Sequence, residues 1–99
     1  MLRLEFAAGS AELSDAARDA LARRAETFKR DESMRIQLQA FATGSGGSEP
    51  RRLSLSRALA VRAFFVERGI ASSRIDVRAL GERSDDGPSE RVDVLAVRR

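Results

Sequence analysis

The sequence contains no cysteine and no histidine among its 99 residues. Without cysteine there are no disulfides, no thiolate metal sites and no cysteine nucleophiles. Without histidine, the usual general base and the usual nitrogen ligand for metals are missing as well. We therefore predict a protein that is not an enzyme, with no cofactor, no catalytic residue and no metal-binding residue.

Long apolar runs are absent too. Runs such as residues 58–61, which Arg62 ends, fall far short of the roughly 20 residues that a spanning helix needs. Residues 1–5 have neither the basic region nor the apolar core of a signal peptide. We expect no membrane insertion by this domain, and either a cytosolic protein or a piece of a longer exported chain.

The charges are nearly balanced, with 18 basic and 15 acidic residues for a net charge of +3. Tyrosine and tryptophan are missing, and the five phenylalanines lie at apolar positions of the pattern, so nothing offers nucleic-acid bases a stacking platform. Nucleic acid is therefore not an expected partner. Hydrophobic residues make up 42% and charged residues 33%, which is typical of a globular domain, and we expect one domain over residues 1–99.

Four segments alternate apolar and polar residues with the period of a β-strand: residues 2–6, 34–40, 74–79 and 91–96. Such alternation predicts a sheet that is covered on one face and wet on the other. The side chains expected on the wet face, with opposite charges near one another, are Arg35, Gln37, Asp76, Arg78, Arg91 and Asp93.

Two segments between the strands have helical spacing. Ser14 is a good N-cap for a first helix of about 15 residues with Asp15 in its first turn. Ser54 can cap a second helix, and Gly69 stands where a left-handed C′ residue belongs. The apolar stripe expected to be buried in this second helix is Leu55, Ala58, Leu59, Val61, Phe65 and Val66.

The other side of the second helix is partly apolar because of Leu53, Ala60 and Phe64. Either the helix is buried on two sides, or this side is a surface that binds a partner. The order strand, helix, strand, helix, strand, strand predicts an α+β fold, a two-layer α/β sandwich with two helices covering one face of four strands. Residues 84–88 (Ser-Asp-Asp-Gly-Pro) predict a tight hairpin turn between the last two strands.

A glycine-rich loop, residues 43–50, leads into the second helix. Its glycines match neither the P-loop nor the dinucleotide-binding spacing. Exposed amides, a helix N-terminus and the nearby Arg51, Arg52 and Arg57 together favour a carboxylate or phosphate ligand. The alternative is that these arginines are a solvated face.

The second helix carries a recognisable string. Residues 53–61 fit Leu-Ser-x-x-Arg-Ala-x-x-Val, Gly69-Ile70 follows, and Arg91-Val92-Asp93 resembles the end of Asn-Arg-Arg-Val-Glu. Together these motifs resemble the OmpA-like domains of the bacterial cell envelope. The resemblance implies a βαβαββ fold with a mixed sheet, and non-covalent binding of the peptidoglycan stem peptide. It also implies a periplasmic or envelope location, within a longer exported or membrane-anchored chain.

In that family an aspartate after the second strand and the arginine of the helix motif grip the charged end of diaminopimelate. Arg57 occupies the arginine position and Arg91 the second arginine of the C-terminal motif, but residues 40–43 are Ala-Phe-Ala-Thr, without the aspartate. The residues that the resemblance and the loop suggest for ligand binding are Arg57, Thr43, Ser54, Arg91 and Glu49, the last in place of the lost aspartate.

Two functions remain open. The first is weak, carboxylate-led binding of peptidoglycan by a non-catalytic envelope domain. The second is a degenerate domain that binds an envelope protein, or a second copy of itself, through the apolar outer side of the second helix.

Overall fold

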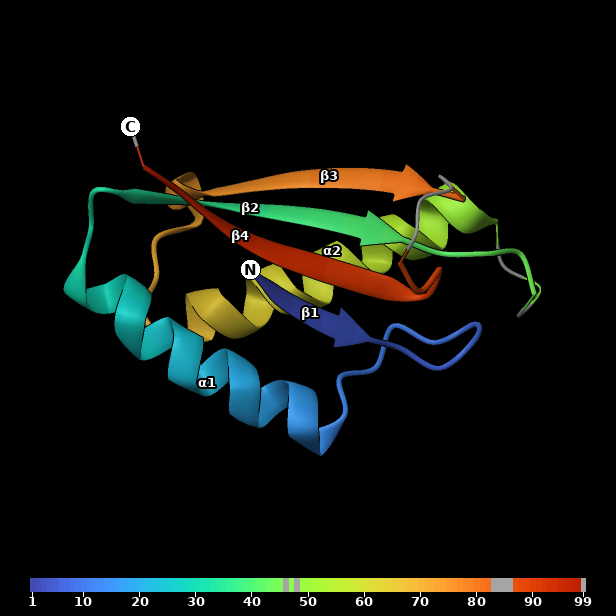
Figure 1. The fold of residues 1–99 in the computed structure, drawn as a ribbon, viewed down its shortest axis with the longest axis horizontal. Helices are drawn as coiled ribbons and strands as arrows, with labels where there is room; N and C mark the ends of the chain where they lie inside the picture. Colours follow the sequence, from blue (N-terminus) through green and yellow to red (C-terminus); the bar gives the residue numbers. More distant parts are fainter. Residues whose placement is uncertain (46, 48, 83–86, 99) are drawn as a thin grey trace.

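The computed structural model describes residues 1–45, 47, 49–82 and 87–98. The elements in chain order are β1 (Leu2–Glu5), α1 (Asp15–Arg30), β2 (Met34–Phe41), α2 (Pro50–Glu67), the short 3-10 helix η1 (Ser72–Arg74), β3 (Ile75–Gly81) and β4 (Arg91–Arg98). Both helices lie on one side of a mixed four-stranded sheet (Figure 1). The predicted two-layer fold is therefore confirmed.

The sheet has the strand order β1-β4-β2-β3, in which β2 and β3 run parallel and the other pairs antiparallel. The parallel pair needs a crossover, and α2 provides it. The hairpin predicted between the last two strands is wrong, because β2 lies between β3 and β4 and pairs with both. Residues 84–86 of that predicted turn lie outside the described residues.

The core lies between the helices and the inner face of the sheet. The central strands contribute Ile36, Leu38, Val92 and Val94, all of which are fully buried. On α1 the helix start is as predicted, since the Ser14 hydroxyl accepts a hydrogen bond from the Ala17 amide at 3.1 Å. The alternation of the strands and the cap of α1 could be predicted from the sequence because both depend only on neighbouring residues.

Helix α2 begins earlier than predicted. Glu49 is its N-cap, with carboxylate oxygens that accept from the Arg51 and Arg52 amides at 2.9 Å each, and Pro50 suits the first helical position. The prediction that Ser54 caps this helix is wrong. Ser54 lies inside the helix, where its buried hydroxyl donates to the Arg51 carbonyl and accepts from the Gly81 amide at 3.1 Å. It thereby joins α2 to the end of β3.

The buried stripe of α2 also differs from the predicted one. Leu55, Leu59 and Val66, which were expected inside, are 41%, 41% and 43% exposed. The residues that are buried are Leu53, Ser54, Arg57, Ala58, Val61, Phe64 and Phe65. The helix thus turns the side that seemed a possible outer surface toward the protein, because that side packs on β2 and β3. The C-terminal end is as predicted, with Gly69 at φ 97°.

The outer face of the sheet is only partly exposed to solvent. Arg35 and Asp76 form the expected exposed ion pair, with Nη2 and Oδ1 2.8 Å apart. Arg91 and Asp93, however, are 2% and 3% exposed, so their predicted position in solvent is wrong. The Arg91 guanidinium lies 3.9 Å from the centre of the Phe41 ring and donates to Asp93 and to the Pro88 carbonyl. The segment before β4 therefore covers this end of the face.

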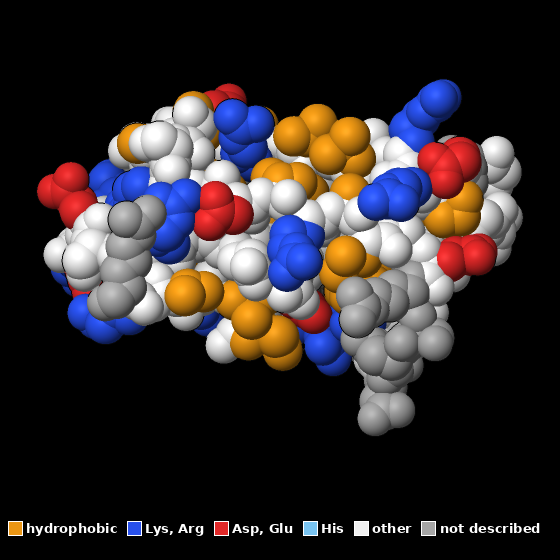
Figure 2. Space-filling model, turned by 90° about the horizontal axis from the view of Figure 1, so that it is seen from above, with side chains coloured by type: hydrophobic (Ala, Val, Ile, Leu, Met, Phe, Trp, Pro, Cys, Tyr) orange, Lys and Arg blue, Asp and Glu red, His pale blue; other side chains and the backbone are white. Residues whose placement is uncertain are grey.

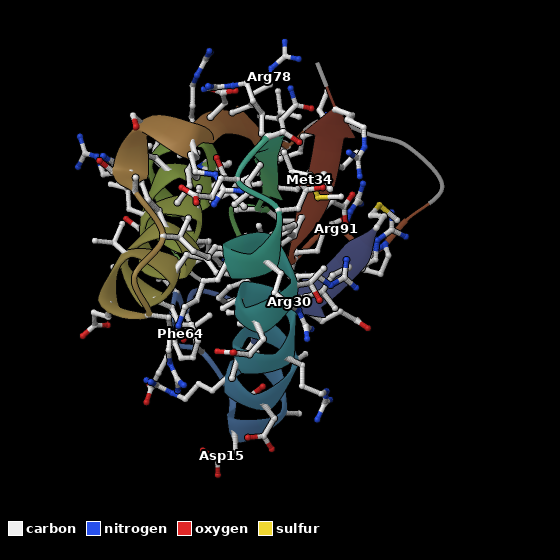
Figure 3. All side chains as sticks on the ribbon, turned by 90° about the vertical axis from the view of Figure 1, so that its left-hand side faces the viewer. Asp15, Arg30, Met34, Phe64, Arg78 and Arg91 are labelled. Carbon is white, nitrogen blue, oxygen red and sulfur yellow. The ribbon has the colours of Figure 1, made fainter. Side chains whose placement is uncertain are left out.

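We expect two outer-face substitutions to differ sharply. Arg78 projects away from the helices (Figure 3), so Arg78→Ala should change the free energy of unfolding by no more than about 0.5 kcal/mol. Asp93→Asn should cost about 1.5 to 3 kcal/mol, because it removes the charge that the side chains of Arg3 and Arg91 bind. Urea denaturation measures the free energy of unfolding of both variants. Equal losses of this free energy would show that Asp93 is exposed.

Candidate functional site

A buried arginine marks one end of the sheet, where β2 ends and α2 passes beneath it. Arg57 is 0% exposed. Its Nε donates to the Ser10 carbonyl at 2.7 Å, its Nη2 to the Ala7 carbonyl at 2.9 Å, and its Nη1 to the Phe41 carbonyl at 2.9 Å. These bonds hold the guanidinium rigidly between the turn after β1 and the end of β2.

The charge of Arg57 is balanced by Glu90, which directly precedes β4. Arg57 Nη1 donates to Glu90 Oε1 at 2.7 Å. The same carboxylate accepts from the Thr43 amide at 3.3 Å, from the Thr43 hydroxyl at 2.5 Å and from the Ser45 hydroxyl at 3.3 Å. The Glu90 side chain remains 20% exposed, so the carboxylate lies on the solvent side of Arg57.

The position of Arg57 follows from the packing of α2. It lies eight residues after the cap Glu49, well inside the helix rather than at its start. It belongs to the buried stripe, and its guanidinium lies 5.0 Å from the centre of the Phe6 ring. A buried arginine requires partners for its charge and its N–H groups, and the described residues leave no buried side-chain nitrogen or oxygen without a hydrogen bond.

The loop amides that were expected to receive a ligand also hold carboxylates of this chain. The Gly44 amide donates to Glu82 at 3.1 Å, and the Arg51 and Arg52 amides donate to Glu49. The end of the sheet is thus an anion-binding region whose donors bind Glu49, Glu82 and Glu90.

The predicted site residues fall into three places. Thr43 and Arg57 come together on the Glu90 carboxylate. Glu49 and Ser54 serve the start and interior of α2. Arg91 stacks on the Phe41 ring while Arg57 binds the Phe41 carbonyl, so the two arginines approach the end of β2 from opposite faces of the sheet.

Glu90 itself was not singled out from the sequence. It precedes Arg91-Val92-Asp93 and so stands where the motif Asn-Arg-Arg-Val-Glu has its first arginine. A reversed charge at that position, in a chain that has lost the aspartate after the second strand, is the signal that could have identified it.

The pKa of Glu90 reflects this environment. Partial burial by itself raises the pKa, but the hydrogen bonds from Thr43 and Arg57 outweigh it and hold the pKa below the ordinary value. A carboxyl whose pKa is lowered by folding stabilises the protein above its unfolded pKa, and this contribution is lost as the pH falls through the folded value.

We therefore expect the wild type to have the larger free energy of unfolding at neutral pH and Glu90→Gln the smaller one. This difference should narrow below about pH 4.3, where glutamate ordinarily titrates. Urea denaturation of both proteins over this pH range measures it. The other acidic groups are common to the two proteins and cancel in the comparison. A difference that does not change with pH would contradict the assignment of the charge to Glu90.

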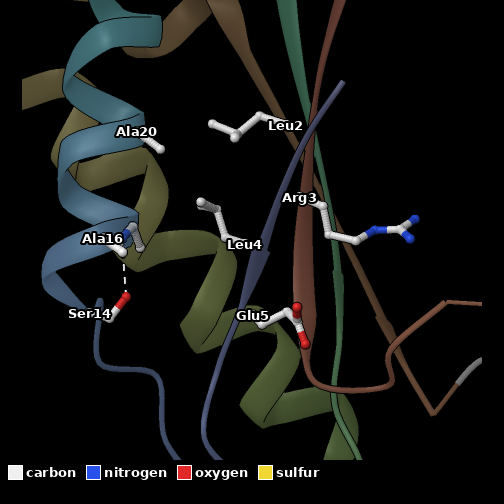
Figure 4. Close-up of a pocket in the computed structure, with 8 residues that line it drawn as sticks. Leu2, Arg3, Leu4, Glu5, Ser14, Ala16 and Ala20 are labelled. Atoms are coloured by element: carbon white, nitrogen blue, oxygen red, sulfur yellow. Dashed lines mark hydrogen bonds between the residues drawn. The ribbon is translucent and has the colours of Figure 1, made fainter.

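Elsewhere the structure has a groove of about 240 Å³ between β1 and α1 (Figure 4). Leu2 and Leu4 point into it from the strand, Ala16 and Ala20 form its helix side, and the Ser14 hydroxyl is engaged in the helix cap.

The described residues contain no cluster of acidic side chains suited to a metal ion. On the face that Figure 2 shows, basic and acidic side chains are interspersed, so this face carries no field of one sign.

The fold and the site define a class of protein: a small two-layer domain with a buried arginine that holds a carboxylate at the end of its sheet. The model of the OmpA family matches residues 5–93. The chain therefore belongs to the OmpA family, as its motifs predicted. No curated protein is significantly similar to it in sequence.

Solved structures show the same fold. The OmpA-like domain of FopA1 from Francisella tularensis matches with a TM-score of 0.84 and 24% identity, over 98% of this chain and 71% of that one. The peptidoglycan-associated lipoprotein from Burkholderia pseudomallei matches at 0.81 and 23%, over 96% and 89%. The C-terminal domain of MotB from Helicobacter pylori matches at 0.87 and 14%, over 100% and 86%.

Proposed function

We propose that residues 1–99 act as one non-catalytic domain of the cell envelope that associates weakly and non-covalently with peptidoglycan. One observation carries this proposal: Arg57, Thr43 and Ser45 together bind a carboxylate at the end of β2. The resemblance stated above assigns Arg57 to the charged end of diaminopimelate, and a solved structure with this fold is named as a peptidoglycan-associated lipoprotein.

The chemistry of the site favours the carboxylate of that zwitterionic end. A guanidinium and a backbone amide are good donors for a carboxylate, and two hydroxyls complete its coordination.

A pull-down with purified peptidoglycan tests the proposal. We expect retention of the protein on peptidoglycan and its release by free diaminopimelate. Free cadaverine (1,5-diaminopentane) is the matched control, because it has the same two amines on the same carbon chain without either carboxylate, and it should release much less. No retention at millimolar protein, or equal release by diaminopimelate and cadaverine, would contradict carboxylate-led binding.

A second candidate function is protein recognition through α2. Its exposed residues Leu55, Leu59 and Val66 follow one another along one side of the helix, beside a depression of about 320 Å³ lined partly by Arg62 and Ser72. An apolar strip flanked by arginine fits an apolar partner segment with acidic flanks.

Over the residues that the structure describes, neither helix combines the length and the apolar character that a membrane crossing requires.

Self-association through this strip would be one form of that function. It would give a monomer–dimer equilibrium in sedimentation experiments, and Leu59→Asp would abolish it by placing a charge in the apolar contact. A wild type that stays monomeric at high concentration would exclude a homodimer through α2.

A further inference from the structure

The Glu90 carboxylate is bound as a ligand would be. Its donors come from other parts of the chain: Arg57 in α2, and Thr43 and Ser45 in the loop after β2. Its own segment directly precedes β4. The receptor and its occupant are therefore far apart in the sequence and are joined only by the fold.

The receptor does not depend on Glu90 for its shape. Arg57 is held by the carbonyls of Ser10, Ala7 and Phe41 at 2.7 to 2.9 Å, and Thr43 lies two residues after the end of β2. If Glu90 left, these donors would still point to the same place. A buried guanidinium without an anion is costly, so the empty place would favour another carboxylate.

Solvent reaches the site from the side of Glu90. Arg57 is 0% exposed, whereas the Glu90 side chain is 20% exposed. A carboxylate arriving from water would therefore reach Arg57 along the path that Glu90 now fills, and the two cannot both occupy it.

We propose that Glu90 is an internal occupant of a carboxylate-binding site and that an external carboxylate binds there only by displacing it. Because Glu90 is part of the same chain, its effective concentration at the site is on the order of millimolar or higher. Removal of Glu90 should therefore raise the affinity for a small carboxylate about tenfold or more. The proposal rests on the proposed function in one respect, that diaminopimelate supplies the natural carboxylate.

Glu90→Ala vacates the site, and Glu82→Ala is the matched control, because Glu82 accepts from the neighbouring Gly44 amide at 3.1 Å. The unfolding temperature of each protein is measured at neutral pH in sodium acetate and in sodium chloride of equal concentration. We expect acetate to raise the unfolding temperature of Glu90→Ala saturably above its value in chloride. For the wild type and for Glu82→Ala, the unfolding temperature should be the same in acetate as in chloride.

Calorimetry with free diaminopimelate is the second measurement, and it should show tighter binding to Glu90→Ala than to the wild type. Stabilisation by acetate without diaminopimelate binding would support the internal occupant and contradict the peptidoglycan proposal. Equal responses of folded Glu90→Ala to acetate and chloride would overturn the internal occupant, whatever diaminopimelate does. If Glu90→Ala is unfolded in chloride, recovery of its circular-dichroism spectrum in acetate supports the proposal, and no recovery overturns it.

Discussion

Arg57→Ala is expected to lower the free energy of unfolding by about 3 to 5 kcal/mol, as the loss of one member of a buried ion pair does. The substitution leaves the carbonyls of Ser10, Ala7 and Phe41 without the donor they now have, and it leaves Glu90 without its cation. Urea denaturation followed by circular dichroism measures the change.

Arg52→Ala is the control for this prediction, because Arg52 is an exposed arginine of the same helix. It should change stability by no more than about 0.5 kcal/mol. If both variants are equally stable, Arg57 is not the structural group that its hydrogen bonds indicate. The expected instability also means that loss of peptidoglycan binding by Arg57→Ala would not prove a ligand contact, so the comparison of diaminopimelate with cadaverine is the decisive test.

Phe65→Ala is expected to cost about 3 to 5 kcal/mol, as large-to-small changes of aromatic core residues do. Phe65 is fully buried, and its ring meets Phe28 edge-on, with centroids 5.6 Å apart and planes at 72°. The cavity left by the ring would lie between the two helices, where the fixed backbones of both limit how far it can close.

Its neighbour Val66 provides the matched control. The sequence pattern placed both residues in the buried stripe, but Val66 is 43% exposed. Val66→Ala should therefore change the free energy of unfolding by no more than about 0.5 kcal/mol. Equal losses for the two variants would show that α2 is rotated about its axis relative to the orientation described above.

The candidate site could be predicted in part. The motif in α2 identified Arg57, and the chain position after β2 identified Thr43 as the residue near the missing aspartate. The partner Glu90 could not be found from spacing, because it comes from a distant segment and meets Arg57 only when β4 pairs with β2. Ser54 is a preferred cap residue, but α2 begins at Pro50 with Glu49 as its cap, and Ser54 instead accepts a buried hydrogen bond from the Gly81 amide.

The sequence by itself determined the elements whose signals are local: the four strands, the cap of α1, the glycine end of α2 and the two-layer fold that these elements require. Only the tertiary structure decided which side of α2 is buried, that Arg91 and Asp93 are covered, and that a carboxylate of this chain occupies Arg57. The physical reason is that alternation and helical spacing report the direction of a side chain relative to its own element. Burial and charge pairing depend on which other segment covers that direction, and segments distant in the sequence provide the cover.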